Sequence, residues 1–182
     1  MKRLQVFLTA AALLAGVACG GSVAHAGLLG DTVRLDYLFP DQSTVFKTLG
    51  TAAVSPTATF SSFGQTQYVV GDTTLAITDI FAGTVLFTAA SFNGIELTEL
   101  THSSITSVSI DAATNLAGFS ASDVSFDASH IFVNLEDLTI TPTTLVQLDI
   151  GTGAIPEPGS LVLLGTGLLG LYGVSRRRRT AK

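Results

Sequence analysis

Residues 130–135 read His-Ile-Phe-Val-Asn-Leu, and every second side chain from Ile131 to Leu135 is a large aliphatic one. Successive side chains of a β-strand point to opposite faces, so this period of two predicts a strand with one buried face and one outer face that carries His130. The same alternation recurs in three further stretches, which are residues 32–39, 74–79 and 145–150.

Shorter stretches of strand-forming residues surround these four, and turn signals such as Gly71-Asp72 and Asn93-Gly94 separate them. They are residues 44–49, 57–63, 66–70, 84–88, 92–98, 105–110 and 122–127. No segment of residues 27–155 keeps a helical period, and only Asp111 to Gly118 suits a short helical turn. Parallel strands would need crossover helices, so the sequence predicts an all-β domain, an antiparallel β-sandwich of about ten strands.

Phenylalanine is expected to supply most of the large side chains in the core of this sandwich. Ten of the eleven phenylalanines lie in the predicted domain, at positions 39, 46, 60, 63, 81, 87, 92, 119, 126 and 132.

Charge divides the 182 residues into three segments. Residues 1–26 carry a net charge of +2, residues 27–155 carry −11, and residues 156–182 carry +4. An acidic middle segment repels phosphate, so we expect no nucleic-acid partner. The single cysteine, Cys19, lies in the first segment, which leaves the middle without a disulfide, a thiol nucleophile or a cysteine metal ligand.

The first segment has the pattern of a secretory signal peptide. Lys2 and Arg3 precede an apolar run that is too short, at roughly 22 Å as a helix, to cross the hydrocarbon core of a bilayer. Ala24 and Ala26 place small side chains before Gly27, which predicts cleavage by signal peptidase between Ala26 and Gly27. An uncleaved anchor, or a lipoprotein modified at Cys19, remains an alternative.

The last segment combines three features in a fixed order. Pro156, Glu157 and Pro158 form an extended stretch, because proline lacks the N–H that helices and sheets need. An uncharged run of residues 159–175 follows, long enough for a single transmembrane helix of roughly 26 Å. The chain then carries four consecutive arginines, which stay on the cytoplasmic side: Arg176, Arg177, Arg178 and Arg179.

Residues 155–181, from Ile-Pro-Glu-Pro-Gly-Ser through the arginine cluster, resemble the PEP-CTERM sorting domain of exported proteins of Gram-negative bacteria. The resemblance implies recognition by an exosortase, an integral-membrane cysteine protease or transpeptidase, which processes the chain near Pro156-Glu157-Pro158. It also implies a role in exopolysaccharide or biofilm production. The alternative is a plain stop-transfer anchor that no enzyme reads.

Together these patterns predict a signal peptide at residues 1–26, an acidic ectodomain at 27–154 and a sorting and anchor segment at 155–182. The inner membrane is then a transient partner of a single-pass intermediate whose domain lies outside. The mature protein belongs at the cell surface or in the extracellular matrix.

Catalytic and metal-binding signals are weak in the middle segment. Ser120 lies in Gly-Phe-Ser-Ala-Ser, which is one residue short of a nucleophile elbow, and His102 and His130 are isolated in sequence. Glu96 and Glu99 form one pair of nearby acids, and Glu136 and Asp137 form another. Side chains alternate between the two faces of a strand, so neither spacing alone brings the carboxylates of a pair together. Calcium could be bound by a loop that gathers acidic side chains, for which the candidates are Asp123, Asp127, Glu136 and Asp137.

The sequence therefore assigns no catalytic residue, no metal ligand and no cofactor, and it predicts a non-catalytic surface or matrix protein. A carbohydrate-binding module is the main alternative, with extracellular polysaccharide as partner and Tyr37 or Tyr68 as stacking residues. A hydrolase is a third possibility, because two carboxylates from distant strands can form a glycosidase site.

Overall fold

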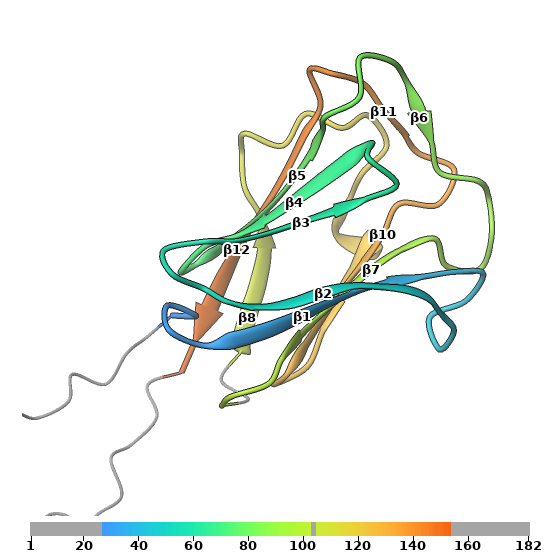
Figure 1. The fold of residues 1–182 in the computed structure, drawn as a ribbon. Helices are drawn as coiled ribbons and strands as arrows, with labels where there is room; N and C mark the ends of the chain where they lie inside the picture. Colours follow the sequence, from blue (N-terminus) through green and yellow to red (C-terminus); the bar gives the residue numbers. More distant parts are fainter. Residues whose placement is uncertain (1–26, 103–104, 154–182) are drawn as a thin grey trace, which may run out of the picture.

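The structure, a computed structural model, describes residues 27–102 and 105–153. Twelve strands and one short 3-10 helix follow one another along this part of the chain (Figure 1). In order they are β1 (Thr32–Leu38), β2 (Val45–Ala53), β3 (Ala58–Ser62), β4 (Thr66–Val70), β5 (Thr74–Asp79), β6 (Val85–Leu86), β7 (Gly94–Glu99), β8 (Ile105–Ile110), η1 (Ala121–Asp123), β9 (Val124–Phe126), β10 (His130–Asn134), β11 (Thr139–Ile140) and β12 (Leu145–Thr152).

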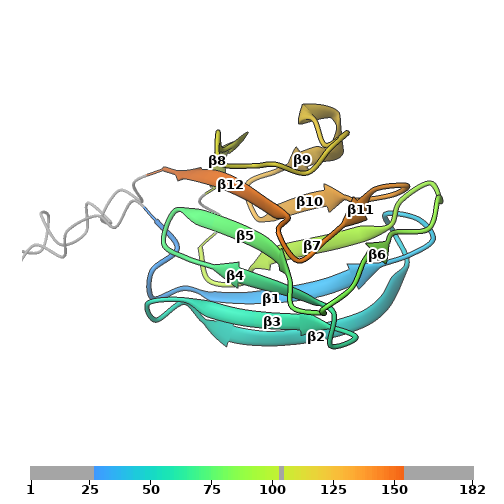
Figure 2. The same ribbon diagram turned by 90° about the horizontal axis from the view of Figure 1, so that it is seen from above.

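Ten of these strands form two five-stranded sheets that lie over one another (Figure 2). One sheet has the order β2-β1-β7-β10-β9 and the other β3-β4-β5-β12-β8, and a small third sheet pairs β6 with β11. All the strand pairs are antiparallel. The prediction of an all-β chain with antiparallel sheets is confirmed for the described residues, whereas the predicted signal helix and transmembrane helix lie outside them.

The two sheets share one core, as the alternation in the sequence predicts. Ile131 and Val133 of β10 are fully buried, while His130 and Phe132 on the other face of the strand are partly exposed. The facing sheet contributes Leu75 and Leu148 among others to the same cluster of buried residues. Apolar burial of this kind contributes about 25 cal/mol per Å² and is the main force that holds the sheets together.

The expectation that phenylalanine builds the core is wrong. Only Phe60, Phe87 and Phe92 fall among the buried side chains of the described residues, and the core is mostly leucine, isoleucine and valine. Four phenylalanines are at least 43% exposed: Phe46, Phe63, Phe81 and Phe126. Most of these lie near the ends of strands or in loops, where the chain leaves the space between the sheets.

Two glycines lie where the predicted strand boundaries differ from the structure or are ambiguous. Asn93-Gly94 has the pattern of a turn, yet Gly94 begins β7 within the predicted strand 92–98, and a Cβ there would meet the carbonyl oxygen of Val133 at 1.9 Å. The strand predicted at residues 44–49 continues in β2 through Gly50, which has a φ of +152° beside a register shift. The short helical turn expected at Asp111 to Gly118 is absent, because these residues form non-helical turns, and the 3-10 helix η1 lies outside that stretch at Ala121–Asp123.

The first and last described residues, Gly27 and Gly153, lie at the same end of the domain (Figure 1). Backbone hydrogen bonds from Leu28 to Asp72 and from Ile150 to Thr73 bring the two chain ends together. No helix within residues 27–102 and 105–153 is long and apolar enough to cross a membrane. β1 runs from this end towards the opposite end, and β7 runs antiparallel to it back to this end. The domain therefore has a tether end and a far end.

Candidate functional site

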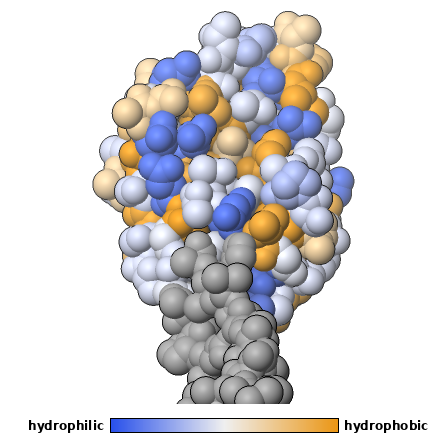
Figure 3. Space-filling view, turned by 90° about the vertical axis from the view of Figure 1, so that its left-hand side faces the viewer, coloured by the Kyte–Doolittle hydropathy of each residue, from blue (hydrophilic) through white to orange (hydrophobic). Residues whose placement is uncertain are grey.

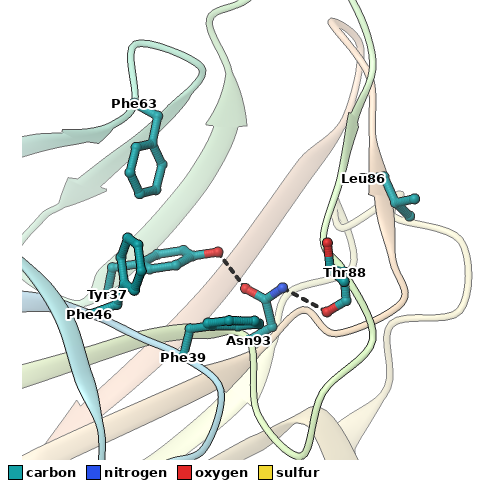
Figure 4. A pocket seen from close by; sticks show the side chains of 7 residues that line it. All are labelled: Tyr37, Phe39, Phe46, Phe63, Leu86, Thr88 and Asn93. Carbon is teal, nitrogen blue, oxygen red and sulfur yellow. Dashed lines mark hydrogen bonds between the residues drawn. The ribbon is translucent and has the colours of Figure 1, made fainter.

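Aromatic side chains gather at the far end of the domain, where β1 ends and β2 begins. Tyr37 and Phe39 come from the end of β1, Phe46 from the start of β2, and Phe63 from the turn between β3 and β4. Together with Leu86, Thr88 and Asn93 they line a cavity of about 260 Å³ (Figure 4). We call this cavity the aromatic pocket.

The ring of Tyr37 meets those of Phe46 and Phe63 edge to face, as Phe39 meets Phe46, whereas Phe46 and Phe63 are tilted at 59° to each other. The ring of Tyr37 lies 5.4 Å from that of Phe63 and 6.3 Å from that of Phe46, at angles of 90° and 74°. Phe46 and Phe63 nevertheless remain 60% and 53% exposed. The ammonium of Lys47 lies 5.4 Å from the centre of the Phe63 ring, a cation–π contact that favours this ring position.

Hydrogen-bonded polar groups also line the aromatic pocket. The hydroxyl of Tyr37 donates a hydrogen bond to Oδ1 of Asn93, and Nδ2 of Asn93 donates to the carbonyl oxygen of Thr88 at 2.7 Å (Figure 4). Asn93 is itself buried, and its backbone N–H donates to Oδ1 of Asn134 at 2.9 Å. Burial raises the pKa of Tyr37, so its hydroxyl stays protonated at neutral pH.

The pocket continues into a smaller hollow of about 100 Å³ that Tyr37, Phe63 and Leu86 also line. Phe63 has a positive φ of 53°, a conformation that costs a non-glycine residue roughly 1–2 kcal/mol. The turn therefore holds a large apolar ring over an open cavity in a backbone conformation that glycine would adopt more readily.

Tyr68, the second tyrosine expected to stack on a sugar, cannot do so. It is fully buried between the sheets, and its hydroxyl lies 3.0 Å from Oγ of Ser62. On β4 it occupies a position of the inward-facing alternation, which a sequence pattern alone does not distinguish from the outer face.

The outer face of the first sheet carries the remaining polar cluster. Asp36 of β1 lies directly opposite Glu96 of β7, and Nε of Arg34 donates to Oδ2 of Asp36 at 2.7 Å. Burial raises the pKa of Glu96, and the neighbouring carboxylate of Asp36 adds to this effect against the opposing influence of His130. His130 is also 2.9 Å from Oδ1 of Asp127, so it lies on the outer face as expected.

The loop expected to bind calcium does not form among the described residues. Asp123 caps η1, Asp127 accepts from the backbone of Ser129, and Glu136 accepts from the backbone of Ala90. None of the four expected acids belongs to a group of three possible metal ligands in the described part of the chain. The group that does form there consists of Asp31, Glu99 and His102, which sequence spacing gave no reason to connect.

The sorting residues cannot be placed in the structure, with one exception. Ala24, Ala26, the Pro156-Glu157-Pro158 stretch and the arginines 176–179 lie outside the described residues. Gly27, the residue after the predicted cleavage, is buried against the side chain of Asp72, where a Cβ would meet Oδ1 at 1.9 Å. The three predicted segments of the chain stay predictions.

Comparison with known proteins identifies the end of the chain but not the β-domain. Residues 154–179 match the family model of the PEP-CTERM protein-sorting motif. No curated protein and no solved structure matches the chain.

Proposed function

The chain carries a PEP-CTERM sorting motif at residues 154–179, the signal of an exosortase-sorted surface protein, and from this we propose that it is a non-catalytic component of the extracellular polysaccharide matrix. The motif is the observation that carries the proposal. It directs the export of the chain through a membrane-anchored intermediate, from which the β-domain is displayed or released.

The surroundings of Ser120 argue against a serine nucleophile at this position. Its hydroxyl lies 2.8 Å from Oγ of Ser122 and 3.1 Å from Oδ2 of Asp123, in the cap of an exposed 3-10 helix. A serine nucleophile needs a general base, usually histidine, within hydrogen-bond reach. The partners of Ser120 in the described residues are instead those of a helix cap.

Replacement of the sorting triplet tests the processing step. We expect the chain with Pro156, Glu157 and Pro158 all changed to alanine to keep its C-terminal segment and to remain in the membrane fraction of its host. Pro142→Ala, which changes a proline in the β-domain, is the matched control and should be processed normally. Normal processing of the triple variant would refute recognition of the triplet.

A second candidate function, saccharide binding, is favoured by the aromatic pocket. Sugars offer apolar C–H faces to aromatic rings and hydroxyl groups to polar side chains, and small-molecule sites are typically apolar with a few oriented polar groups. The exposed rings of Phe46 and Phe63 supply the apolar surface, and the Tyr37–Asn93 pair supplies the polar groups. A volume of about 260 Å³ lies at the small end of ligand sites, so it suits one sugar unit of a chain.

Exposed phenylalanines provide a matched test of this second function. Phe46→Ala and Phe63→Ala should each weaken retention in a gel that contains the host's exopolysaccharide by tenfold or more. Phe81→Ala removes a ring of similar exposure, 47%, that does not line the pocket, and should leave retention unchanged. Equal retention of all three variants and the parent chain would exclude the pocket as the saccharide site.

A further inference from the structure

Two acidic side chains and one histidine meet at the tether end of the domain, at the opposite end of β1 from the aromatic pocket. Asp31 precedes β1, Glu99 ends β7, and His102 follows it in the chain. The ligand atoms of these three side chains all lie within 4.8 Å of one another. We call them the tether-end triad. Figure 3 looks onto this end, where hydrophilic side chains lie among hydrophobic ones.

The backbone holds the tether-end triad in a fixed place. The N–H of Leu100 donates to the carbonyl of Thr32, and the N–H of Thr32 donates to the hydroxyl of Thr101 at 2.8 Å. Glu99, the last residue of β7, donates its backbone N–H to the carbonyl oxygen of Ser129. The segment that carries Glu99 and His102 is therefore fastened to the start of β1, where Asp31 lies.

Burial differs sharply within the triad. Asp31 and Glu99 are only 6% and 4% exposed, whereas 44% of the His102 side chain is accessible. Two carboxylates taken out of water close to each other repel and lose hydration, so they favour a cationic neighbour.

From this arrangement we propose that Asp31, Glu99 and His102 bind a divalent transition-metal ion such as Zn²⁺. Nδ1 of His102 lies 2.6 Å from Oδ1 of Asp31 and 3.9 Å from Oε1 of Glu99. Zinc bonds to nitrogen and carboxylate oxygen are about 2.0–2.2 Å long, so two ligand atoms of one tetrahedral ion lie roughly 3.4 Å apart. Nδ1 of His102 and Oδ1 of Asp31 would therefore have to separate by roughly 0.8 Å to bind one ion, and Nδ1 and Oε1 of Glu99 would have to approach by roughly 0.5 Å.

The donor set selects the class of ion. Imidazole nitrogen suits zinc and related transition metals, whereas calcium takes oxygen ligands, usually six or more. Binding requires the lone pair of Nδ1, so a proton on that nitrogen leaves to water when the ion enters. Three protein ligands leave a fourth position open to solvent on the exposed side of His102.

A bound ion would join the start of β1 to the end of β7. These strands are neighbours in the first sheet, and the same end of the domain holds Gly27 and Gly153. The ion would therefore stabilise the end of the domain at which the described chain begins and ends. This inference does not depend on the sorting motif or on saccharide binding.

Titration of the full chain with zinc tests the proposal. The detergent-solubilised chain is treated with EDTA, dialysed, and titrated with zinc chloride in a calorimeter, and its melting temperature is measured with and without zinc. We expect a melting temperature that zinc raises and EDTA restores. His102→Gln should weaken zinc binding at least tenfold.

His130→Gln is the matched control, because His130 also contacts a carboxylate, Asp127, but lies outside the triad. It should bind zinc as the parent chain does. Asp31→Asn, which keeps the side-chain shape, provides a second variant and should also lose zinc binding. Far-UV circular dichroism without zinc shows that each variant is folded.

Three results would overturn the proposal. The parent chain could show no zinc-dependent change, which would make His102 only an ionic contact of the two acids. The two histidine variants could bind zinc equally. Calcium could stabilise the parent chain and the His102 variant alike while zinc does nothing, which would describe an oxygen-only site.

Discussion

Tyr68→Phe removes one hydroxyl from the centre of the core and leaves the ring in place. Tyr68 is fully buried, and burial raises the pKa of its hydroxyl well above the usual value, so the group is a neutral hydrogen-bonding partner. The hydroxyl of Tyr68 lies 3.0 Å from Oγ of Ser62, a residue that is only 2% exposed. The substitution therefore removes the hydrogen-bond partner of a buried hydroxyl. An unsatisfied buried polar group costs about 1–3 kcal/mol, so we expect the free energy of unfolding to fall by about 2 kcal/mol.

Urea denaturation of the Tyr68→Phe, Ser62→Ala and double variants measures this directly. The double variant should lose less stability than the sum of the two single variants, because it does not leave Oγ of Ser62 without a partner. The slope of the transition should not change, since the exposed surface is the same. Additive losses within about 0.5 kcal/mol would refute the pairing of the two hydroxyls. Retention on exopolysaccharide should stay unchanged, and its loss would refute the structural role of Tyr68.

Three further changes test the packing and the charges. Leu97→Ala, at a fully buried position of β7, should lower the free energy of unfolding by about 2–5 kcal/mol in urea denaturation. Gly94→Ala should prevent folding or lower the melting temperature far more than Gly64→Ala, because only the first places a Cβ against the backbone of Val133. Glu96 has a raised pKa in the folded state, so stability attributable to it is present at low pH and lost as the pH rises through that pKa. Glu96→Gln should therefore stabilise the chain at pH 7 and make no difference in acid, as pH-dependent melting would show.

Strand positions could be predicted from the sequence where one face is buried. In residues 130–135 the period of two separates buried Ile131 and Val133 from partly exposed His130, and the structure has the same faces. Glycine makes the strand boundaries harder to predict, because β2 passes through Gly50, just beyond the predicted strand 44–49, and Gly94 begins β7 although Asn93-Gly94 has the pattern of a turn. The two-residue strands β6 and β11 are too short to show a period.

Among the residues proposed to bind a ligand, Tyr37 was predicted from the sequence, whereas Phe46, Phe63 and the tether-end triad were not. Hydrophobicity alone places Phe46 and Phe63 in the core, yet both lie where the strands end and their rings have no facing sheet to cover them. The tether-end triad joins Asp31 to His102 across 71 positions, through the pairing of β1 with β7. Residue types gave no sign of this contact, because only the register of the two strands creates it.

The intact mass of the protein recovered from the surface of its native host tests the central claim most directly. Export and exosortase processing predict a chain that begins at Gly27 and ends between Ile155 and Gly159. A recovered chain that still extends to Lys182, in a host with an active exosortase, would contradict the account.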